Sequence, residues 1–359
     1  AEWDREDALP GWVLGRLVEL GVTGALVPTA YGGRGYGVSD LVPTWRTLSQ
    51  GWISLTGAVN PTGLATTLLS RHGTEEQRKR WLPGIASGGV LASFSITEPQ
   101  AGSDLDRLET SAEALPGGGL KLDGEKRWVA GGVTSDVIFM MTQVAGSEKP
   151  SCVVLPKAGR GSDGWQVTEL DKVGYRGVES AAYVFEGFEA EGAEVLGGED
   201  GLGAGARFML DALDVGRVNV ACRALGIIDR CLASAVEEST TREIGDGLLG
   251  DHTHAQMRIG ELVARRHAVA ALVDRAAAAV DAGRAGGESQ SRELSTSAKI
   301  VASDTAVWAV DAASRLAASR SYAAGDELAR LRRDAPQTQI GEGANDALLM
   351  ALAKPELAD

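Results

Sequence analysis

The sequence predicts a mostly helical protein with a central β domain, and two changes of period along the chain carry this prediction. Apolar residues recur at helical spacing up to about residue 92 and again after Gly205, whereas short β-branched and aromatic runs fill 93–200. The 359 residues suffice for two or three cores, since one domain commonly takes about 100–200 residues. We therefore expect an N-terminal helical domain over 1–92, a middle β domain over 93–200 and a C-terminal helical bundle over 201–359.

Helices and loops alternate in the first segment. Residues 12–20 carry an apolar stripe at helical spacing, and a glycine-rich stretch over 28–37 predicts a loop. Thr74 then stands three residues before Gln77, the spacing of a capping box, in which side chain and backbone of the two residues exchange hydrogen bonds. The helix that follows is expected to stop before Pro83, because proline lacks the N–H that a helix interior needs.

The middle segment reads as short strands that Gly, Pro and Asp separate, which predicts a compact β-barrel or sandwich. The predicted strands cover 137–141, 152–155, 165–167 and 182–185.

Long amphipathic patterns return after Gly205, and their alanine-rich faces at 267–279 and 306–318 allow close helix contacts. Gly283 and Gly286 mark one break between helices. Short connections between the predicted helices favour a four-helix bundle. The predicted helices cover 206–237, 253–282 and 293–319, with a shorter one from about 345.

The composition limits the classes of binding partner and the cellular compartment that we expect. With 35 basic and 49 acidic residues the net charge is −14, which argues against nucleic-acid or anionic-membrane binding and leaves small molecules or proteins. Cys152, Cys222 and Cys231 have no metal-ligand spacing and form no complete disulfide set, so we expect buried thiols in a reducing cytoplasm. The sequence contains no run of about 18 apolar residues, which a membrane helix would need, and its first residues do not resemble a signal peptide.

The stretch Phe94–Asp104 is the most informative part of the chain. Pro99 fixes a turn and Gly102 adds flexibility, so the Thr97 and Ser103 hydroxyls and nearby amides are able to meet one polar ring or phosphate. The stretch resembles the "TEPGAGSD" signature of the acyl-CoA dehydrogenase family. In that family the segment lies along the flavin and touches the thioester end of the substrate. On its own, the stretch would rather be interpreted as an ordinary capped turn.

A single carboxylate near the C-terminus is the candidate base. Glu342 stands between Gly341 and Gly343 just before an apolar helix, and this segment resembles the family's "YEGT" element. The resemblance implies that Glu342 removes the α-proton of an acyl thioester while FAD accepts the β-hydride. Such a base works best in a dry pocket that raises its pKa. The alternative is an exposed loop carboxylate that favours a helix start.

Further matches occur in the expected order along the chain. Trp128 corresponds to the family's "KxWIT" strand, where the indole lies against the flavin; the alternative is a tryptophan of the β core. Asp214 and Arg217 match a "DxxR" element that lines the thioester channel, although an (i, i+3) pair is also a common surface salt bridge. Arg242 matches an arginine that reaches the flavin pyrophosphate across a subunit interface, where its fork suits phosphate oxygens.

The resemblance implies two sets of binding residues and no metal site. The cofactor set is Phe94, Ile96, Thr97, Ser103, Trp128, Ala130, Arg242, Arg315, Ala344 and Asn345. The substrate set is Ser103, Asp214, Arg217 and Gly343.

Several cofactor positions depart from the family pattern. Ala130 replaces a threonine near the reactive edge of the flavin, and Ile244 replaces the aromatic ring of an "RxxFG" stretch. Residues 315–319, with Arg315 at their start and Ser319 at their end, replace a "QxxGG" segment on the adenosine side. Gly341 and Ala344 stand where the family has the tyrosine before the base and the threonine after it.

The leading interpretation is an FAD-dependent dehydrogenase that desaturates an acyl thioester on CoA or on an acyl-carrier protein, and relatives of the latter kind belong to specialised metabolism. One alternative is a lyase, isomerase or cyclase with the flavin inert or absent. A second alternative is a non-enzymatic module that binds an acyl carrier. The resemblance also implies a homodimer or homotetramer, and an electron-transfer flavoprotein or oxygen as the electron acceptor.

Overall fold

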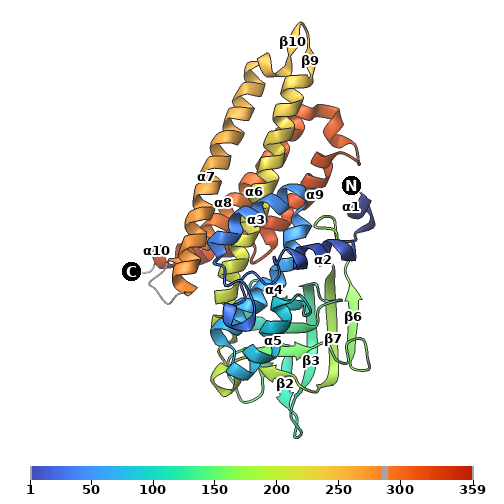
Figure 1. Ribbon diagram of the computed structural model, residues 1–359, viewed down its shortest axis with the longest axis vertical. Helices are drawn as coiled ribbons and strands as arrows, with labels where there is room; N and C mark the ends of the chain where they lie inside the picture. Colours follow the sequence, from blue (N-terminus) through green and yellow to red (C-terminus); the bar gives the residue numbers. More distant parts are fainter. Residues whose placement is uncertain (1, 285–289, 358–359) are drawn as a thin grey trace.

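The computed structural model describes residues 2–284 and 290–357. Figure 1 shows an elongated molecule with a bundle of long helices at one end, a β domain at the other and shorter N-terminal helices between them. The N-terminal helices are α1 (Glu2–Glu6), α2 (Gly11–Glu19), α3 (Val38–Gly51), α4 (Ile53–His72) and α5 (Glu75–Ala86). Short 3-10 turns occupy Thr29–Tyr31, Leu105–Arg107, Gly198–Gly201, Leu249–Asp251 and Ala318–Tyr322.

The capping box of α5 is confirmed, whereas its predicted end is wrong. The Thr74 hydroxyl accepts from the Gln77 amide at 3.2 Å, and the Gln77 side chain accepts from the Thr74 amide at 3.0 Å. The helix continues through Pro83 to Ala86. Pro83 stands in the last turn, so the one helical bond it cannot make is its own to Lys79, and its carbonyl still accepts a bond from the Ser87 amide at 3.1 Å.

The middle of the chain forms one sheet in the order β6-β7-β3-β2-β4-β5-β8, with β1 paired in parallel to β4. All four predicted runs are strands. The pattern does not predict β1, β2 and β8, which are four residues or fewer. It also misses the 11-residue β3, for which only the resemblance at Trp128 implied a strand. The strands are β1 (Ala92–Ser95), β2 (Ser111–Ala114), β3 (Leu120–Ala130), β4 (Val137–Val144), β5 (Ser151–Pro156), β6 (Trp165–Glu169), β7 (Ser180–Ala190) and β8 (Glu194–Val195).

Long helices build the C-terminal part, and one of them is absent from the predicted set. Three buried residues of α9, Leu328, Leu331 and Ala335, join the bundle core. The fourth core helix is therefore α9, and α10 lies at the edge of the bundle (Figure 1). These helices are α6 (Gly205–Thr241), α7 (Thr253–Arg284), α8 (Ser291–Ala317), α9 (Glu327–Ile340) and α10 (Asn345–Glu356), with a hairpin of β9 (Glu243–Ile244) and β10 (Gly247–Leu248).

The predicted break between helices is confirmed, since α7 ends at Arg284, next to Gly283, and α8 begins at Ser291. Gly286 lies outside the described residues. The bundle core continues into α3 and the start of α4, so the N-terminal helices pack directly against α6. A second core lies between α4, α5 and strands β1 and β4. As a result, α4 is enclosed between the bundle and the sheet.

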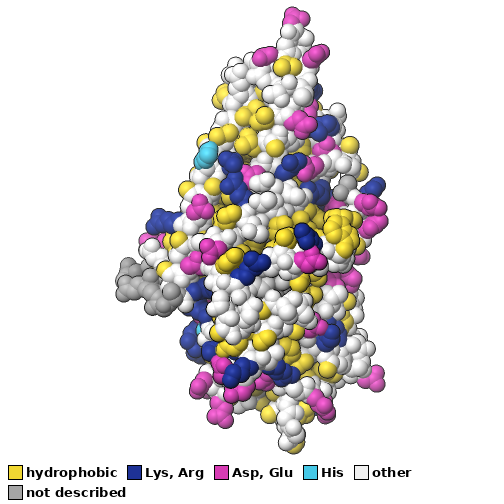
Figure 2. All heavy atoms as spheres, in the orientation of Figure 1, with side chains coloured by type: hydrophobic (Ala, Val, Ile, Leu, Met, Phe, Trp, Pro, Cys, Tyr) yellow, Lys and Arg dark blue, Asp and Glu magenta, His cyan; other side chains and the backbone are white. Residues whose placement is uncertain are grey.

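Charged and apolar side chains are interspersed over the face seen in Figure 2, and apolar ones gather over α1 and α2, where Trp12 is exposed and contacts Trp3. Cys152, Cys222 and Cys231 are free and buried, as expected. Within 2–284 and 290–357, no helix has the length and apolar character needed to cross a membrane.

Candidate functional site

The candidate base stands on a short, constrained link between α9 and α10. Glu342 has a φ of 56° and Gly343 a φ of 103°, so a side-chain-bearing residue is held in the left-handed region, which such residues seldom adopt. The ammonium of Lys299 on α8 donates to the carbonyls of Gln339 at 2.8 Å and Gly343 at 2.6 Å. Because these two carbonyls flank Glu342, one buried ammonium fixes the backbone on both sides of the base.

The carboxylate of Glu342 lies inside the molecule, between α4 and α6. The side-chain amide of Asn60 donates to Oε1 at 2.7 Å. On the opposite side is Gly216, where an added Cβ would be 2.8 Å from Cδ of Glu342 and 3.0 Å from Oε2. Glycine at 216 therefore leaves the space that the carboxylate occupies, and the acid is not the exposed loop residue of the alternative interpretation.

Burial raises the pKa of Glu342 above the ordinary range of a glutamate. Four groups act in the opposite direction, namely the charge of Arg223, the Asn60 hydrogen bond, and the charges of Arg217 and Lys299. For Lys299, burial acts in the other direction because the charged form is the ammonium: it lowers the pKa to about 7, and the charge of Glu342 opposes this shift. The site thus combines a desolvated carboxylate with nearby cations, an arrangement suited to moving a proton.

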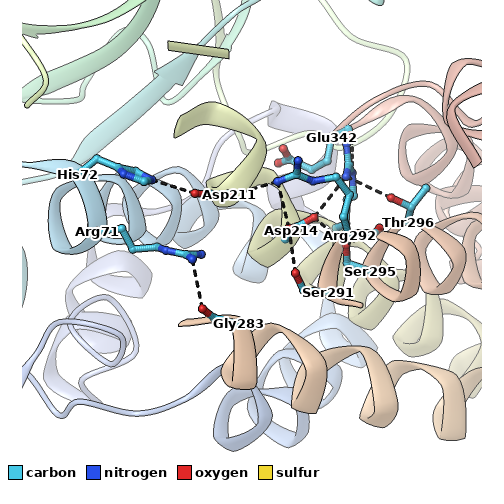
Figure 3. A network of polar contacts seen from close by, with 11 residues as sticks. Arg71, His72, Asp211, Asp214, Gly283, Ser291, Arg292, Ser295, Thr296 and Glu342 are labelled. Carbon is cyan, nitrogen blue, oxygen red and sulfur yellow. Dashed lines mark hydrogen bonds and ion pairs between the residues drawn. The ribbon is translucent and has the colours of Figure 1, made fainter. Parts of the chain in front are cut away.

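Asp214 and Arg217 form a buried pair beside the base rather than a surface salt bridge. The Arg217 guanidinium lies 3.4 Å from the Asp214 carboxylate and donates to the Thr296 hydroxyl at 3.1 Å. Ser295 donates to Asp214 at 2.9 Å. Figure 3 shows Glu342 next to this network, to which α6 contributes Asp214 and α8 contributes Ser295 and Thr296.

Arg217 connects that pair to the base, since its Nε donates to the main-chain oxygen of Glu342 at 3.4 Å. The network continues towards the surface through Arg292, which contacts Asp211 at 3.1 Å and Asp214 at 3.6 Å. Burial raises the pKa of the Asp214 carboxyl, and the charges of Arg292 and Arg217 oppose that rise.

The turn after β1 is held by a fully buried ion pair. The Lys126 ammonium lies 2.7 Å from Glu98, with the two side chains 0% and 1% exposed, and it also donates to the Ile96 carbonyl at 3.1 Å. The amides of Glu109 and Thr110 donate to the same carboxylate at 2.7 and 3.1 Å. The pair thus connects the Thr97 turn to the strand that carries Trp128.

Trp128 is an exposed aromatic residue in a strained conformation. Its φ is 60° and its side chain 57% exposed, and the pairing of β3 with β7 shifts between Lys126 and Val129. This irregularity turns the indole outward while Val129 stays buried. The indole is therefore not a residue of the β core, and strain at an exposed aromatic ring is typical of a binding surface.

Three domain models match the chain: acyl-CoA dehydrogenase N-terminal domain over residues 1–89, middle domain over 93–188 and C-terminal domain over 203–357. The chain belongs to the acyl-CoA dehydrogenase family. Members of this family are FAD-dependent oxidoreductases that dehydrogenate acyl thioesters, and this protein is accordingly an FAD-dependent oxidoreductase.

Relatives of several activities are about equally similar. Acryloyl-CoA reductase (NADH) of Anaerotignum propionicum is 28% identical over 98% of this chain and 88% of its own length. Glutaryl-CoA dehydrogenase of Desulfococcus multivorans is 28% identical, covering 99% of this chain and 91% of its own. The structure of butyryl-CoA dehydrogenase from Megasphaera elsdenii superposes with a TM-score of 0.90 at 27% identity, over 99% of this chain and 92% of that one.

The surface around Trp128 fits the isoalloxazine of the family's FAD. Phe94, Ile96, Thr97 and Ala130 are all partly exposed and Ser103 is exposed at the end of the turn. The Arg127 amide, next to Trp128 in the chain, donates to the Thr97 carbonyl at 2.8 Å. A planar apolar ring would cover this aromatic surface, and the turn offers hydroxyl and amide donors for its polar edge. The Ala130 carbonyl accepts from the Ser93 hydroxyl at 3.1 Å, so this carbonyl is engaged within the protein.

The residues expected on the pyrophosphate side are not brought to this site within one chain. From Gly216 to Arg242 is 26 residues of helical rise, or about 39 Å, and Arg242 lies at the far end of α6 (Figure 1). There its guanidinium donates to the Leu316 carbonyl at 3.0 Å. Arg315 is exposed and pairs with Asp311 at 2.7 Å. A second protomer would have to bring these arginines to a flavin at Trp128.

The loop residues beyond Glu342 take structural positions. Asn345 is buried: its side-chain oxygen accepts from Lys299 at 2.7 Å, and its amide donates to Ser303 and Asp304 at 3.0 and 2.8 Å. Its side chain is thus engaged by the protein itself. Gly343 is exposed and Ala344 partly exposed at the start of α10.

Sequence reasoning missed the partners that give Glu342 its environment, namely Asn60, Gly216, Arg223 and Lys299. A signal existed for Lys299, since it is a lone lysine among the small buried residues of α8. No comparable local signal marks Asn60, which is 282 positions from its partner.

Proposed function

We propose that this family member oxidises an acyl thioester between Cα and Cβ, with Glu342 as the base that removes the α-proton. The observation that carries the proposal is the inward-pointing carboxylate, held by Asn60 at 2.7 Å and seated against Gly216. Burial raises its pKa, which strengthens the carboxylate as a proton acceptor.

The other residues around Glu342 orient this proton transfer. Asn60 fixes one carboxylate oxygen, so the second oxygen is left for the substrate. Among the described residues no acceptor bonds the Glu342 amide N–H, so this donor is available for the thioester oxygen as negative charge develops. The Lys299 bonds keep carboxylate and amide in a fixed relation.

FAD, when bound, supplies the hydride acceptor. Its ring would be held by Phe94, Ile96, Thr97, Ser103, Trp128 and Ala130. In a homodimer or homotetramer, Arg242 and Arg315 would bind the pyrophosphate of the FAD that belongs to a neighbouring protomer. A phosphopantetheine arm, of CoA or of a carrier protein, would reach the base past the Asp214–Arg217 pair. The reduced cofactor would pass its electrons to an electron-transfer flavoprotein or to oxygen.

The test is anaerobic bleaching of the purified yellow protein by acyl-CoA thioesters. We expect the wild type to bleach, and Glu342→Gln to stay yellow without bleaching because only the proton acceptor is lost. Glu356→Gln, at an exposed glutamate near the end of α10, is the matched control and should bleach as the wild type does.

Bleaching that survives in Glu342→Gln would contradict the role of the base. Consumption of the thioester without any bleaching would instead support a lyase, isomerase or cyclase that uses Glu342 alone.

A further inference from the structure

A buried arginine with no carboxylate partner among the described residues lies on α6, about two helical turns beyond Gly216, and its guanidinium reaches back one turn to Asn219. Arg223 is 2% exposed. Its Nε donates to the Asn219 side-chain oxygen at 2.8 Å and its Nη1 to the Tyr175 hydroxyl at 3.0 Å. Within 2–284 and 290–357, no carboxylate forms an ion pair with it. Removing a cation from water costs free energy, so a buried arginine needs another group that offsets its charge.

Arg223 and the two groups that it contacts each have a hydrogen-bond donor that no acceptor among the described residues uses. Asn219 is fully buried, its oxygen is taken by Arg223, and its amide nitrogen has no hydrogen-bond partner. The Tyr175 oxygen already accepts from the guanidinium, so its own hydrogen remains to be donated. Guanidinium, amide and phenol thus leave only N–H and O–H groups unsatisfied, and the complement of such a set is an anion.

This cluster is built in a constrained way. Tyr175 has a φ of 56°, and its amide donates to the buried Asp334 carboxylate at 2.8 Å. Its phenol lies against α4 at Gly57, where a side-chain methyl group would overlap the hydroxyl. The guanidinium also lies 5.2 Å from the centroid of the Tyr175 ring. A strained backbone and a glycine contact that together fix one phenol are features of a binding site rather than of general packing.

The cluster lies on the same face of α6 as the base. Gly216, Asn219 and Arg223 follow one another at helical spacing, and a helical side chain covers the turn before its own Cα. The bond to Asn219 confirms that the guanidinium does so. The step from residue 216, where the Glu342 carboxylate lies, to residue 219 is about 4.5 Å along the axis. On α4, Gly57 and Asn60 repeat the same one-turn step from cluster to base.

Arg223 also acts on Glu342 at longer range, since its charge lowers the pKa of that carboxyl against the effect of burial. Glu342 takes its hydrogen bond from Asn60 and forms no ion pair with Arg223 within the described residues. Charge balance by Glu342 alone therefore leaves the free donors of Asn219 and Tyr175 unexplained.

We propose that the acyl group of the substrate carries a carboxylate of its own, a few bonds from Cα, which Arg223 binds together with Tyr175 and Asn219. The substrate class is the monothioester of a short dicarboxylic acid of four or five carbons, because only about one helical turn separates the base from the cluster. The inference rests on the proposed function. Overall similarity does not select it, because glutaryl and butyryl enzymes are 28% and 27% identical to this chain.

The test compares glutaryl-CoA with pentanoyl-CoA, which has the same number of carbons and no carboxylate. We expect kcat/KM of the wild type to favour glutaryl-CoA at least tenfold, with most of the difference in KM. Dissociation constants measured calorimetrically in the Glu342→Gln background should show the same preference without turnover.

In the Glu342→Gln background, where the effect of the Arg223 charge on the base plays no part, Arg223→Gln should weaken the binding of glutaryl-CoA alone, while the dissociation constant of pentanoyl-CoA stays within about threefold. Arg223→Lys keeps the charge without the planar fork and should give an intermediate ratio. Arg230→Gln is the matched control on the same helix, since Arg230 is already paired with Glu327 at 2.6 Å. Tyr175→Phe provides a second variant, should Arg223→Gln fail to fold, and it should reduce the preference by loss of one donor.

A wild type that prefers pentanoyl-CoA, or a preference that survives in Arg223→Gln, would overturn the inference and leave the proposed function intact. If neither thioester binds or bleaches the wild type, the proposed function fails and this inference fails with it.

Discussion

Asn60 offers the most direct test of how the environment of Glu342 is set. Its amide donates to the carboxylate at 2.7 Å, and such a bond stabilises the ionised form only. Hydrogen bonds to charged groups contribute about 1.5–3 kcal/mol, and one pKa unit corresponds to about 1.4 kcal/mol. Replacing Asn60 by alanine should therefore raise the pKa of Glu342 by about one to two units.

The sign of the effect on activity follows from the role of a base. Glu342 must be deprotonated to accept a proton, so kcat/KM should rise with pH through its pKa, which burial already raises. In Asn60→Ala this acidic limb should move to higher pH by about one to two units, as the pKa does. Activity near the alkaline plateau should recover towards the wild-type value.

The assay is the pH profile of kcat/KM with an artificial electron acceptor, which avoids the titration of a protein partner. Thr66→Ala is the control, because Thr66 is buried in the same helix and its hydroxyl donates only to the Thr62 carbonyl at 2.8 Å. An acidic limb that stays in place in Asn60→Ala, or moves to lower pH, would refute the assignment of this carboxylate as the ionising base.

Two further substitutions test the space and the charges around the site. Gly216→Ala places a Cβ 2.8 Å from Cδ of Glu342, so kcat/KM should fall about 10²-fold because the base is displaced. Gly260→Ala is the control, since nothing lies within 4 Å of its added methyl group, and it should keep the wild-type kcat/KM. Equal values of kcat/KM in the two variants would contradict the close fit at Gly216. Lys126→Met should lower the free energy of unfolding by about 3–5 kcal/mol, because it strands the buried Glu98 charge. The denaturation midpoint should recover in part when Glu98→Gln is added, and a single variant as stable as the wild type would show that the pair is dispensable.

Local patterns were sufficient wherever one stretch of chain determines its own structure. The spacing of Thr74 and Gln77 predicts the capping box that the structure contains, and short β-branched or aromatic runs predict β4 to β7. The pattern fails for α9, which is polar over most of its surface and contains Pro336. That helix forms because Leu328 and Leu331 are buried against the bundle, and such a tertiary contact has no local signal.

The same limit applies to the candidate site. Two flanking glycines and a following helix single out Glu342, but the groups that set its pKa come from α4, α6 and α8. Arg223 and Asn219 read in sequence as ordinary polar residues of a long helix. Only the fold reveals that both are buried, that Arg223 contacts both Asn219 and Tyr175, and that Asn219 lies about one helical turn from residue 216, beside the Glu342 carboxylate.

The Lys299 bonds have a consequence for how substrate enters. One ammonium holds carbonyls on both sides of Glu342, so the link between α9 and α10 cannot swing aside unless both contacts break together. We therefore expect the link to remain closed throughout turnover. Access to the Glu342 carboxylate must then come from movement elsewhere, and the carboxylate is already in position before any ligand binds.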